Sequence, residues 1–211
     1  MKKLLLTALI TSMLLLPVST IALADHEEAP VQAPTQVQDF RPGDMPAGMG
    51  PCEAMAPALH GMVLAMMNHD AQTFDRGDGE LAWECLYNTL SLYGQLDSRS
   101  EVQEDVLYFP VETAQDYAAA LDVVLGELSP LPEELTDRLT YDRTQGAYQA
   151  VCGCDSLSQI QVRDVRSTDQ GLQLTGALVY IVENQDLAQF QATLQPRDNM
   201  FGYAITELKL V

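Results

Sequence analysis

Apolar residues recur at helical spacing over the first part of the folded region. Met55, Leu59, Met62 and Met66 lie on one stripe of a helix that is predicted to start at Pro51 and to end near Asn68. A turn rich in Asp and Gly, residues 75–79, separates this segment from a second stripe that runs from Trp83 to Tyr93 and stops at Gly94. The two segments are therefore predicted to form a helical hairpin.

The segment after the hairpin alternates between element types. Residues 106–110 have the composition of a short strand, and Thr113 opens a third predicted helix that continues to Leu128. Pro130 stops that helix. One or two further helical turns are predicted over residues 133–139.

From Tyr141 onward the apolar period changes from the helical value to two. The clearest example is residues 188–195, where Ala and Phe alternate with Gln and Thr, so that one face of the strand is wet. Five strands are predicted, at residues 147–153, 159–166, 172–182, 188–194 and 201–210. Because short polar turns join them, the expected fold class is α+β, with N-terminal helices packed on a C-terminal curved antiparallel β-meander of about five strands.

The N-terminus has the pattern of a secretory signal peptide. Lys2 and Lys3 precede an apolar run that Pro17 breaks after about 13 residues, shorter than the ~20 of a spanning helix. A small-x-small cleavage site, residues 22–24, follows. We therefore expect a signal peptide over 1–24, a flexible Pro/Gly-rich leader over 25–51 and a single α+β domain over 52–211. The mature protein is expected in the periplasm or outside the cell, with no stable membrane anchor after cleavage.

The charge of the chain restricts its partners. The 211 residues include 30 acidic and 11 basic side chains, a formal charge of −19. Loss of Lys2 and Lys3 with the signal would bring the charge to −21. Such a protein lacks the basic face that nucleic acids require, and its acidity favours a cationic partner.

The order of elements over residues 106–211, together with the closing phrase Phe201-Gly202-Tyr203-Ala204-Ile205, resembles the cystatin-like and nuclear-transport-factor-like rolls. It is also similar to small exported bacterial proteins of unknown function that end in such a meander. The resemblance implies a concave sheet face that binds ligands, partners or, less often, substrates. It assigns no role to any single residue.

Four cysteines, Cys52, Cys85, Cys152 and Cys154, follow the predicted signal. In an oxidising compartment an even number predicts two structural disulfides, and three pairings are open. A bond between Cys52 and Cys85 would tie the hairpin, whereas Cys152 and Cys154 are separated only by Gly153. A bond within that Cys-Gly-Cys segment would be strained, so thiol-redox activity is an alternative function.

Methionine and histidine gather over residues 45–69, and thioether and imidazole groups are ligands that suit Cu(I). Met45, Met49, His60 and His69 are the candidate ligands of a periplasmic copper-binding protein, a second alternative. Other methionines of this segment lie on the apolar helical stripe, where they also serve as core residues.

The common catalytic templates are absent from the sequence, including Gly-x-Ser-x-Gly and His-Glu-x-x-His. A nucleophile–histidine arrangement would depend on His60 or His69 reaching a nucleophile. The expected function is therefore non-catalytic binding of a protein or small-molecule ligand, without a cofactor, through the sheet face or the helix cleft.

Overall fold

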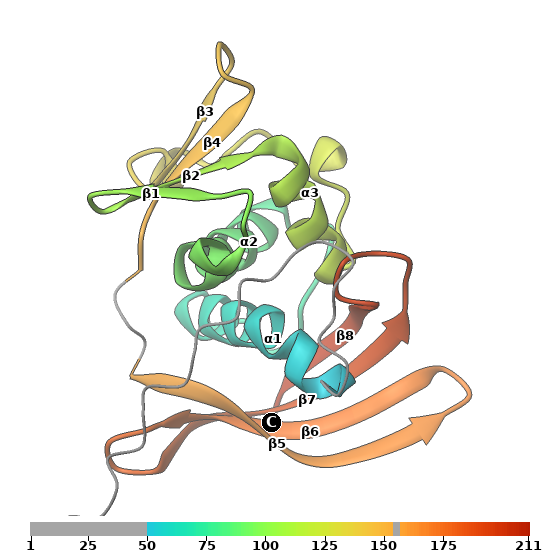
Figure 1. The fold of residues 1–211 in the computed structure, drawn as a ribbon. Coiled ribbons are helices and arrows are strands. Elements are labelled where there is room, and N and C mark those ends of the chain that lie inside the picture. The colour runs from blue at the N-terminus through green and yellow to red at the C-terminus, as the bar shows by residue number, and fades with distance from the viewer. Residues whose placement is uncertain (1–49, 154–156) are drawn as a thin grey trace, which may run out of the picture. The chain divides into compact units, whose positions relative to one another are not determined.

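The computed structural model describes residues 50–153 and 157–211 (Figure 1). The helices, with η marking short 3-10 turns, are α1 (Pro51–Asn68), α2 (Gly79–Tyr93), η1 (Gly94–Leu96), α3 (Val111–Ala120), η2 (Leu125–Glu127) and η3 (Glu133–Leu135). The strands are β1 (Glu101–Gln103), β2 (Val106–Pro110), β3 (Leu139–Asp142), β4 (Ala147–Val151), β5 (Ser158–Thr168), β6 (Gly171–Tyr180), β7 (Gln185–Pro196) and β8 (Tyr203–Leu210).

Two antiparallel sheets enclose the helices of the described region (Figure 1). The first sheet has the order β1-β2-β4-β3 and packs against α2 and α3. The second has the order β5-β6-β7-β8 and packs against α1. The α1–α2 hairpin therefore lies between the sheets, and one continuous apolar core extends from one sheet through the helices to the other.

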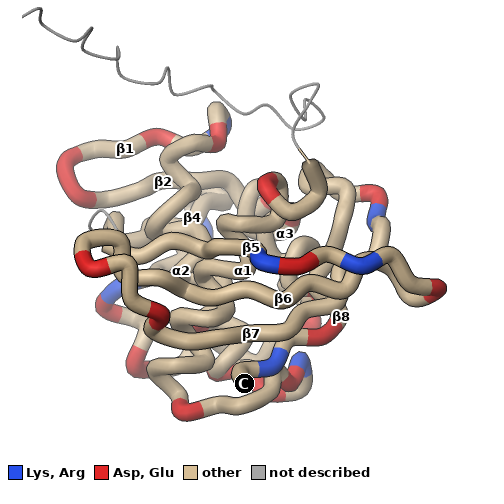
Figure 2. Tube along the Cα trace, turned by 90° about the horizontal axis from the view of Figure 1, so that it is seen from below, with Lys and Arg blue, Asp and Glu red and all other residues tan. Residues whose placement is uncertain are grey.

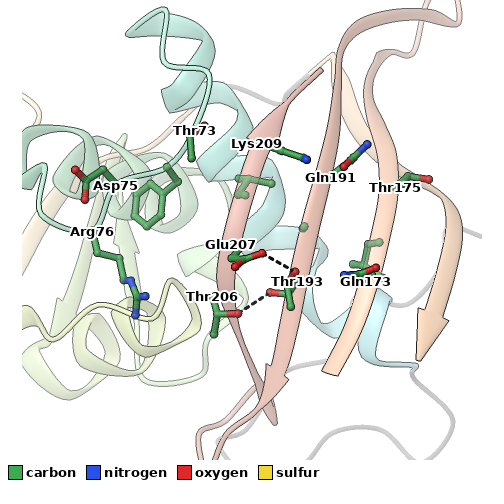
Figure 3. Close-up of a pocket in the computed structure, with 14 residues that line it drawn as sticks. Thr73, Asp75, Arg76, Gln173, Thr175, Gln191, Thr193, Thr206, Glu207 and Lys209 are labelled. Carbon is green, nitrogen blue, oxygen red and sulfur yellow. Dashed lines mark hydrogen bonds between the residues drawn. The ribbon is translucent and has the colours of Figure 1, made fainter. Parts of the chain in front are cut away.

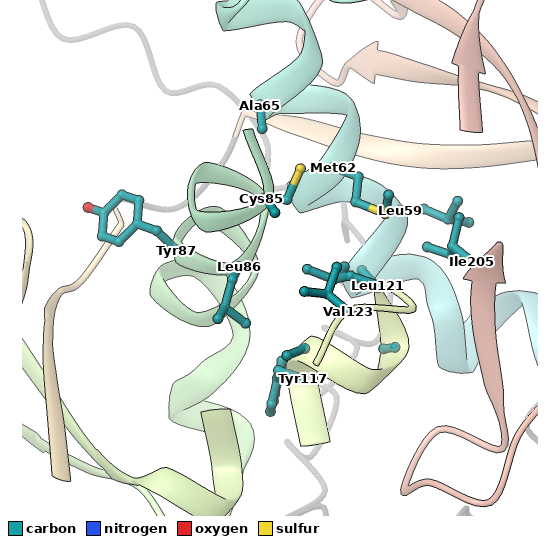
Figure 4. Packing of buried hydrophobic residues seen from close by; sticks show 14 of the residues in the cluster. Leu59, Met62, Ala65, Cys85, Leu86, Tyr87, Tyr117, Leu121, Val123 and Ile205 are labelled. Carbon is teal, nitrogen blue, oxygen red and sulfur yellow. The ribbon is translucent and has the colours of Figure 1, made fainter. Parts of the chain in front are cut away.

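Helix α1 is buried on more than one side, because it contacts α2 on one face and the second sheet on another. Met55, Leu59, Met62 and Met66 are fully buried, as expected for the apolar stripe. Gly61 allows the closest approach to α2, since a Cβ there would lie 2.1 Å from Thr89 Oγ1 and 2.7 Å from the Thr89 backbone nitrogen. Figure 4 shows buried apolar side chains of the core around the two helices, with Met62 and Ala65 of α1 near Cys85 of α2.

The first sheet covers α2 with aromatic side chains. Tyr148 of β4 stacks on Phe109 of β2 with a centroid distance of 5.6 Å. On α2 itself, Glu84 forms an ion pair with Arg138 (3.1 Å), whose guanidinium lies 4.8 Å from the ring centroid of Tyr87. The carboxylate of Glu84 is thus buried with a charged partner, which offsets the cost of desolvating it.

The second sheet is a simple meander with one protected edge. Residues 72–74 run beside β8, where Phe74 N–H donates to Leu208 O and Leu210 N–H donates to Gln72 O, both at 2.9 Å. Thr73 forms an isolated bridge with Lys209. The outermost strand, β8, therefore has its free hydrogen-bonding edge occupied by the loop between α1 and α2.

The α+β class and the antiparallel meander are confirmed, but the expectation of one sheet with about five strands is corrected. All five predicted strands exist, yet the first of them, β4, pairs with β2 and β3 in the other sheet. The short connection after β4 suggested a hairpin with β5. Instead the chain runs past the end of the helical layer, where Gly153 N–H donates to Ser91 O at 2.9 Å. The described region has eight strands in two sheets.

The third helix is shorter than its apolar pattern predicts. It ends at Ala120, although the stripe continues to Leu128. Asp122 adopts a left-handed conformation with φ of 57°, and Val123 N–H donates back to Ala118 O at 3.1 Å. This turn ends the helix. The usual sequence signal for such a turn is glycine or asparagine, so the aspartate at this position did not predict a helix end.

The predicted signal peptide, 1–24, and all but the last two residues of the predicted leader, 25–51, lie outside the described residues. Within the described part, no helix is both long and apolar enough to cross a membrane.

Candidate functional site

A hollow of about 710 Å³ lies on the outer face of the second sheet, the face turned away from α1 (Figure 3). Its floor is formed by β6, β7 and β8. One wall is the segment Thr73–Arg76, which we call the arm, and which rises beside β8. Phe74 of the arm is buried in the core, so the arm is anchored by an apolar side chain as well as by backbone hydrogen bonds.

The strand register arranges the polar side chains of the floor in two rows across the strands (Figure 3). In the first row, Thr175 of β6 is opposite Gln191 of β7, which is opposite Lys209 of β8, and the Thr73–Lys209 bridge extends this row onto the arm. In the second row, Gln173 is opposite Thr193, which is opposite Glu207. Adjacent strands are spaced at about 4.8 Å, so members of each row recur at that interval.

Several polar groups of the hollow are already engaged within the protein. Arg76 forms an ion pair with Asp122, and Arg197 approaches the same carboxylate at 3.6 Å. Glu207 Oε2 accepts a hydrogen bond from Thr193 Oγ1 at 3.2 Å, and Asp75 Oδ1 accepts one from Gly77 N–H at 2.8 Å. These interactions hold the wall and the Thr193–Glu207 part of the second row in place, whereas the side chain of Gln173 is exposed and makes no hydrogen bond with another described residue.

The polar groups of the first row, in contrast, are available for hydrogen bonds with a ligand. The side chains of Thr73, Lys209, Gln191 and Thr175 are exposed and make no side-chain hydrogen bond or ion pair with any other described residue. Lys209 is also the only lysine of the chain after Lys3. The row therefore presents one ammonium, one primary amide and two hydroxyl groups to whatever enters the hollow.

The middle of this face, over β6 and β7, carries little charge although the protein is strongly acidic, whereas the outer strands β5 and β8 carry several charged residues (Figure 2). Strands β6 and β7 contain a single charged residue, Asp186, and its carboxylate is paired with Arg163 (2.5 Å). The pocket lining itself balances two cations, Arg76 and Lys209, against two carboxylates, Asp75 and Glu207. The formal charges of the lining therefore give no net preference for a ligand of either sign.

The structure brings one sequence-predicted residue, His60, to a nucleophile-type side chain. His60 Nε2 lies 3.0 Å from Ser158 Oγ, and His60 Nδ1 lies 2.5 Å from the Tyr93 hydroxyl. His60 is fully buried, and this burial lowers its pKa to about 4. The ring is therefore neutral at neutral pH, and its hydrogen bonds connect α1 to α2 and to the start of β5. This connection is a structural role that the sequence did not indicate.

The candidate copper ligands are not brought together in the described region. His69 is exposed at the C-terminal end of α1, nine positions from the buried His60. Met45 and Met49 lie outside the described residues. Within residues 50–153 and 157–211, no group of three His, Cys, Asp or Glu side chains is placed to hold a metal ion. A copper site remains a prediction.

Three of the four cysteines, Cys52, Cys85 and Cys152, are described, and no disulfide joins any two of these three. Since Gly61 faces Thr89 in the antiparallel hairpin, Cys52 and Cys85 are separated by about 13 residue rises along the helix axes, roughly 20 Å. This exceeds the ~7 Å limit between the Cα atoms of a disulfide. The pairing of Cys52 with Cys85 is thus incompatible with this hairpin register.

The local environment of Cys152 does not favour a reactive thiolate. Burial raises the thiol pKa, and the carboxylate of Asp105 raises it further. Cys154, the other half of the predicted redox pair, lies outside the described residues. Disulfide formation by these cysteines, like thiol-redox activity, stays a prediction.

The residues of the hollow were not among the sequence candidates. The alternation of Gln and Thr along residues 188–195 was visible, but it indicated only a wet face. What the sequence did not show is that the loop at 73–76 returns to β8 and forms a wall on that face.

Comparison with known proteins adds no assignment, because no protein-family model, curated protein or solved structure matches the chain significantly.

Proposed function

We propose that the protein is an exported, non-catalytic binding domain that takes a polar ligand in the hollow between the arm and strands β6–β8. The observation that carries the proposal is the row of unengaged polar side chains on the floor, beside groups that are already bonded within the protein. Export rests on the signal-type pattern at the N-terminus, and the roll resemblance agrees with ligand binding on a sheet face.

Rigidity of the surroundings supports a preformed site. The arm is fixed to β8 by backbone hydrogen bonds and to the core by Phe74, and Glu207 is held by Thr193. A ligand would therefore meet side chains on regular strands and would not have to order the backbone beneath it, which reduces the entropic cost of binding.

The proposal is tested by thermal unfolding of the full chain with the low-molecular-weight fraction of an extract from the producing organism. A ligand that binds only the folded state raises the unfolding temperature. We expect this rise for the unaltered protein and for Gln103→Trp, which places the same indole side chain on an exposed strand of the other sheet. We expect it to disappear in Thr175→Trp, which fills the hollow. An equal rise in both variants, or none in the unaltered protein, would contradict the proposal.

A further inference from the structure

We infer that the ligand of this hollow is an extended, neutral oligosaccharide lying across the strands, along the row Thr73–Lys209–Gln191–Thr175. The inference rests on the proposed function and names the class of ligand that the same site recognises.

The first step is the type of hydrogen bond that the row offers. The amide of Gln191 and the hydroxyls of Thr73 and Thr175 both donate and accept, and Lys209 donates only. Such a mixed set matches sugar hydroxyl and acetamido groups, which also donate and accept. A purely anionic or a purely cationic ligand would leave part of this set without a complementary partner.

The second step is the spacing. Polar groups in the row recur at the interstrand distance of about 4.8 Å, which is close to the length of one pyranose ring linked through opposite carbons. An extended peptide fits less well, because its residues repeat at about 3.3 Å and its side chains alternate between two faces, so that groups on one face recur at about 6.6 Å.

The third step is charge. The two cations and two carboxylates of the lining cancel, and β6 and β7 carry one paired charge between them. The chain as a whole has a formal charge of −19, which repels polyanionic polysaccharides. The negative charge of the protein does not repel a neutral oligosaccharide, which is also rich in hydroxyl groups.

The hollow also lacks an exposed aromatic platform, because the only aromatic lining residue, Phe74, is buried. Without ring stacking, we expect weak binding with a Kd of about 1 mM. Nuclear magnetic resonance titration suits this range. The probes are the β-1,4-linked tetramers of glucose and of N-acetylglucosamine, with tetragalacturonate as the acidic comparison and an acetylated, amidated tetra-alanine as the peptide comparison.

Lys209 provides a direct signal at the site. Reductive methylation with ¹³C labels Lys2, Lys3, Lys209 and the N-terminal amine of the full chain, and the Lys209 signal is the one missing from Lys209→Gln. We expect this signal and the backbone amide signals of β6–β8 to shift in a saturable way with at least one neutral tetramer. Tetragalacturonate and tetra-alanine are expected to leave them in place.

Matched variants distinguish the loss of a contact in the hollow from a change in the net charge of the protein. Lys209→Gln replaces the ammonium with a neutral, shorter amide, and Gln191→Ala removes an amide. Each is expected to weaken binding about 3- to 10-fold. Arg143→Gln removes the same charge from the β3–β4 turn, at the other described cation that has no ion pair, and Gln103→Ala removes an exposed glutamine from β1. Both controls are expected to bind normally.

Two outcomes would overturn the inference: no shift at the hollow with either neutral tetramer, or equal weakening by Lys209→Gln and Arg143→Gln. The proposed function fails separately. If the extract stabilises the protein through the hollow but neither tetramer binds, only the ligand class is wrong. If neither the extract nor any probe acts at the hollow, both are wrong.

Discussion

His60 shows how a single buried side chain links the helices to the second sheet. Its ring contacts Tyr93 of α2 and Ser158 of β5 through its two nitrogens. The two bonds fix the orientation of the ring. Protonation would place a positive charge in a fully buried position, which is the reason for the low pKa.

The low pKa of His60 predicts acid sensitivity. Above pH 6.5 the ring is neutral in both the folded and the unfolded chain. Between pH 6.5 and about 4 the unfolded chain binds the proton and the folded chain does not, so the free energy of unfolding falls by about 1.4 kcal/mol per pH unit. Urea denaturation at pH 7 and pH 4.5 is expected to show a loss of about 2 to 3 kcal/mol attributable to this residue.

His60→Gln is the reference for this experiment, because it retains a hydrogen-bonding side chain but does not titrate. The carboxylates contribute to the pH dependence of both proteins, so the difference between them reports His60. The same pH dependence in both would contradict the prediction. A direct titration of the His60 ring protons in the unaltered protein gives a second reading that does not depend on the folding of the variant.

At the scale of elements, the helical hairpin depends on the absence of a side chain at Gly61. A Cβ at this position would meet the hydroxyl and the backbone of Thr89 at less than 3 Å, so the two helices would have to move apart. We expect Gly61→Ala to lower the free energy of unfolding by about 2 to 3 kcal/mol, because overpacking outweighs the better helix propensity of alanine.

Gly126→Ala is the matched control for the hairpin prediction. Nothing lies within 4 Å of a Cβ there, and we expect a change within about 0.5 kcal/mol in urea denaturation. Equal stability of Gly61→Ala and the unaltered protein would show that the hairpin tolerates a wider separation.

The elements themselves were largely accessible from the sequence, but their grouping was not. The stripe from Met55 to Met66 predicted α1 with the bounds that the structure shows, and the strict alternation at residues 188–195 predicted β7. Strands β1 and β3 were missed because they are short and carry little apolar alternation. The division into two sheets depends on the path of the chain after β4. The chain can turn back to pair β5 with β4 or continue to the other sheet, and a short connection is compatible with either path.

The hollow could not be predicted from the sequence, because it too depends on how distant elements are grouped. Its floor is an alternating strand pattern that any solvated sheet face would show. Its wall comes from residues 73–76, more than a hundred positions away from β8. Local periodicity carries no information on such a contact.

For the whole molecule, the excess of acidic residues predicts a dependence of stability on salt. With a formal charge of −19, the acidic side chains repel one another. This repulsion is stronger in the folded chain, where the charges lie closer together than in the unfolded chain. Raising the ionic strength from ~0.01 M to ~0.15 M shortens the screening length from about 30 Å to about 8 Å. We therefore expect the unfolding temperature to rise over this range in scanning calorimetry.

A variant with fewer charges tests the origin of the salt effect. Glu101 and Glu104 are exposed and form no ion pair in the described region, so Glu101→Gln combined with Glu104→Gln lowers the repulsion without breaking a contact to a cation. This protein is expected to show a smaller rise with salt. An equal or larger rise in the variant would contradict general repulsion as the origin of the effect. A fall in the unaltered protein would mean that ion pairs such as Arg99–Asp97 outweigh the repulsion.

The position of α1 between α2 and the second sheet has a consequence for how the chain is made. This helix is the first element of the described region, yet one of its apolar faces is covered by β8, the last strand. A chain that is synthesised or threaded through a membrane N-terminus first keeps this face uncovered until residue 210 has emerged. Folding of this layer therefore depends on long-range contacts and cannot be completed before β8 has emerged, so the emerging chain needs protection from aggregation until then.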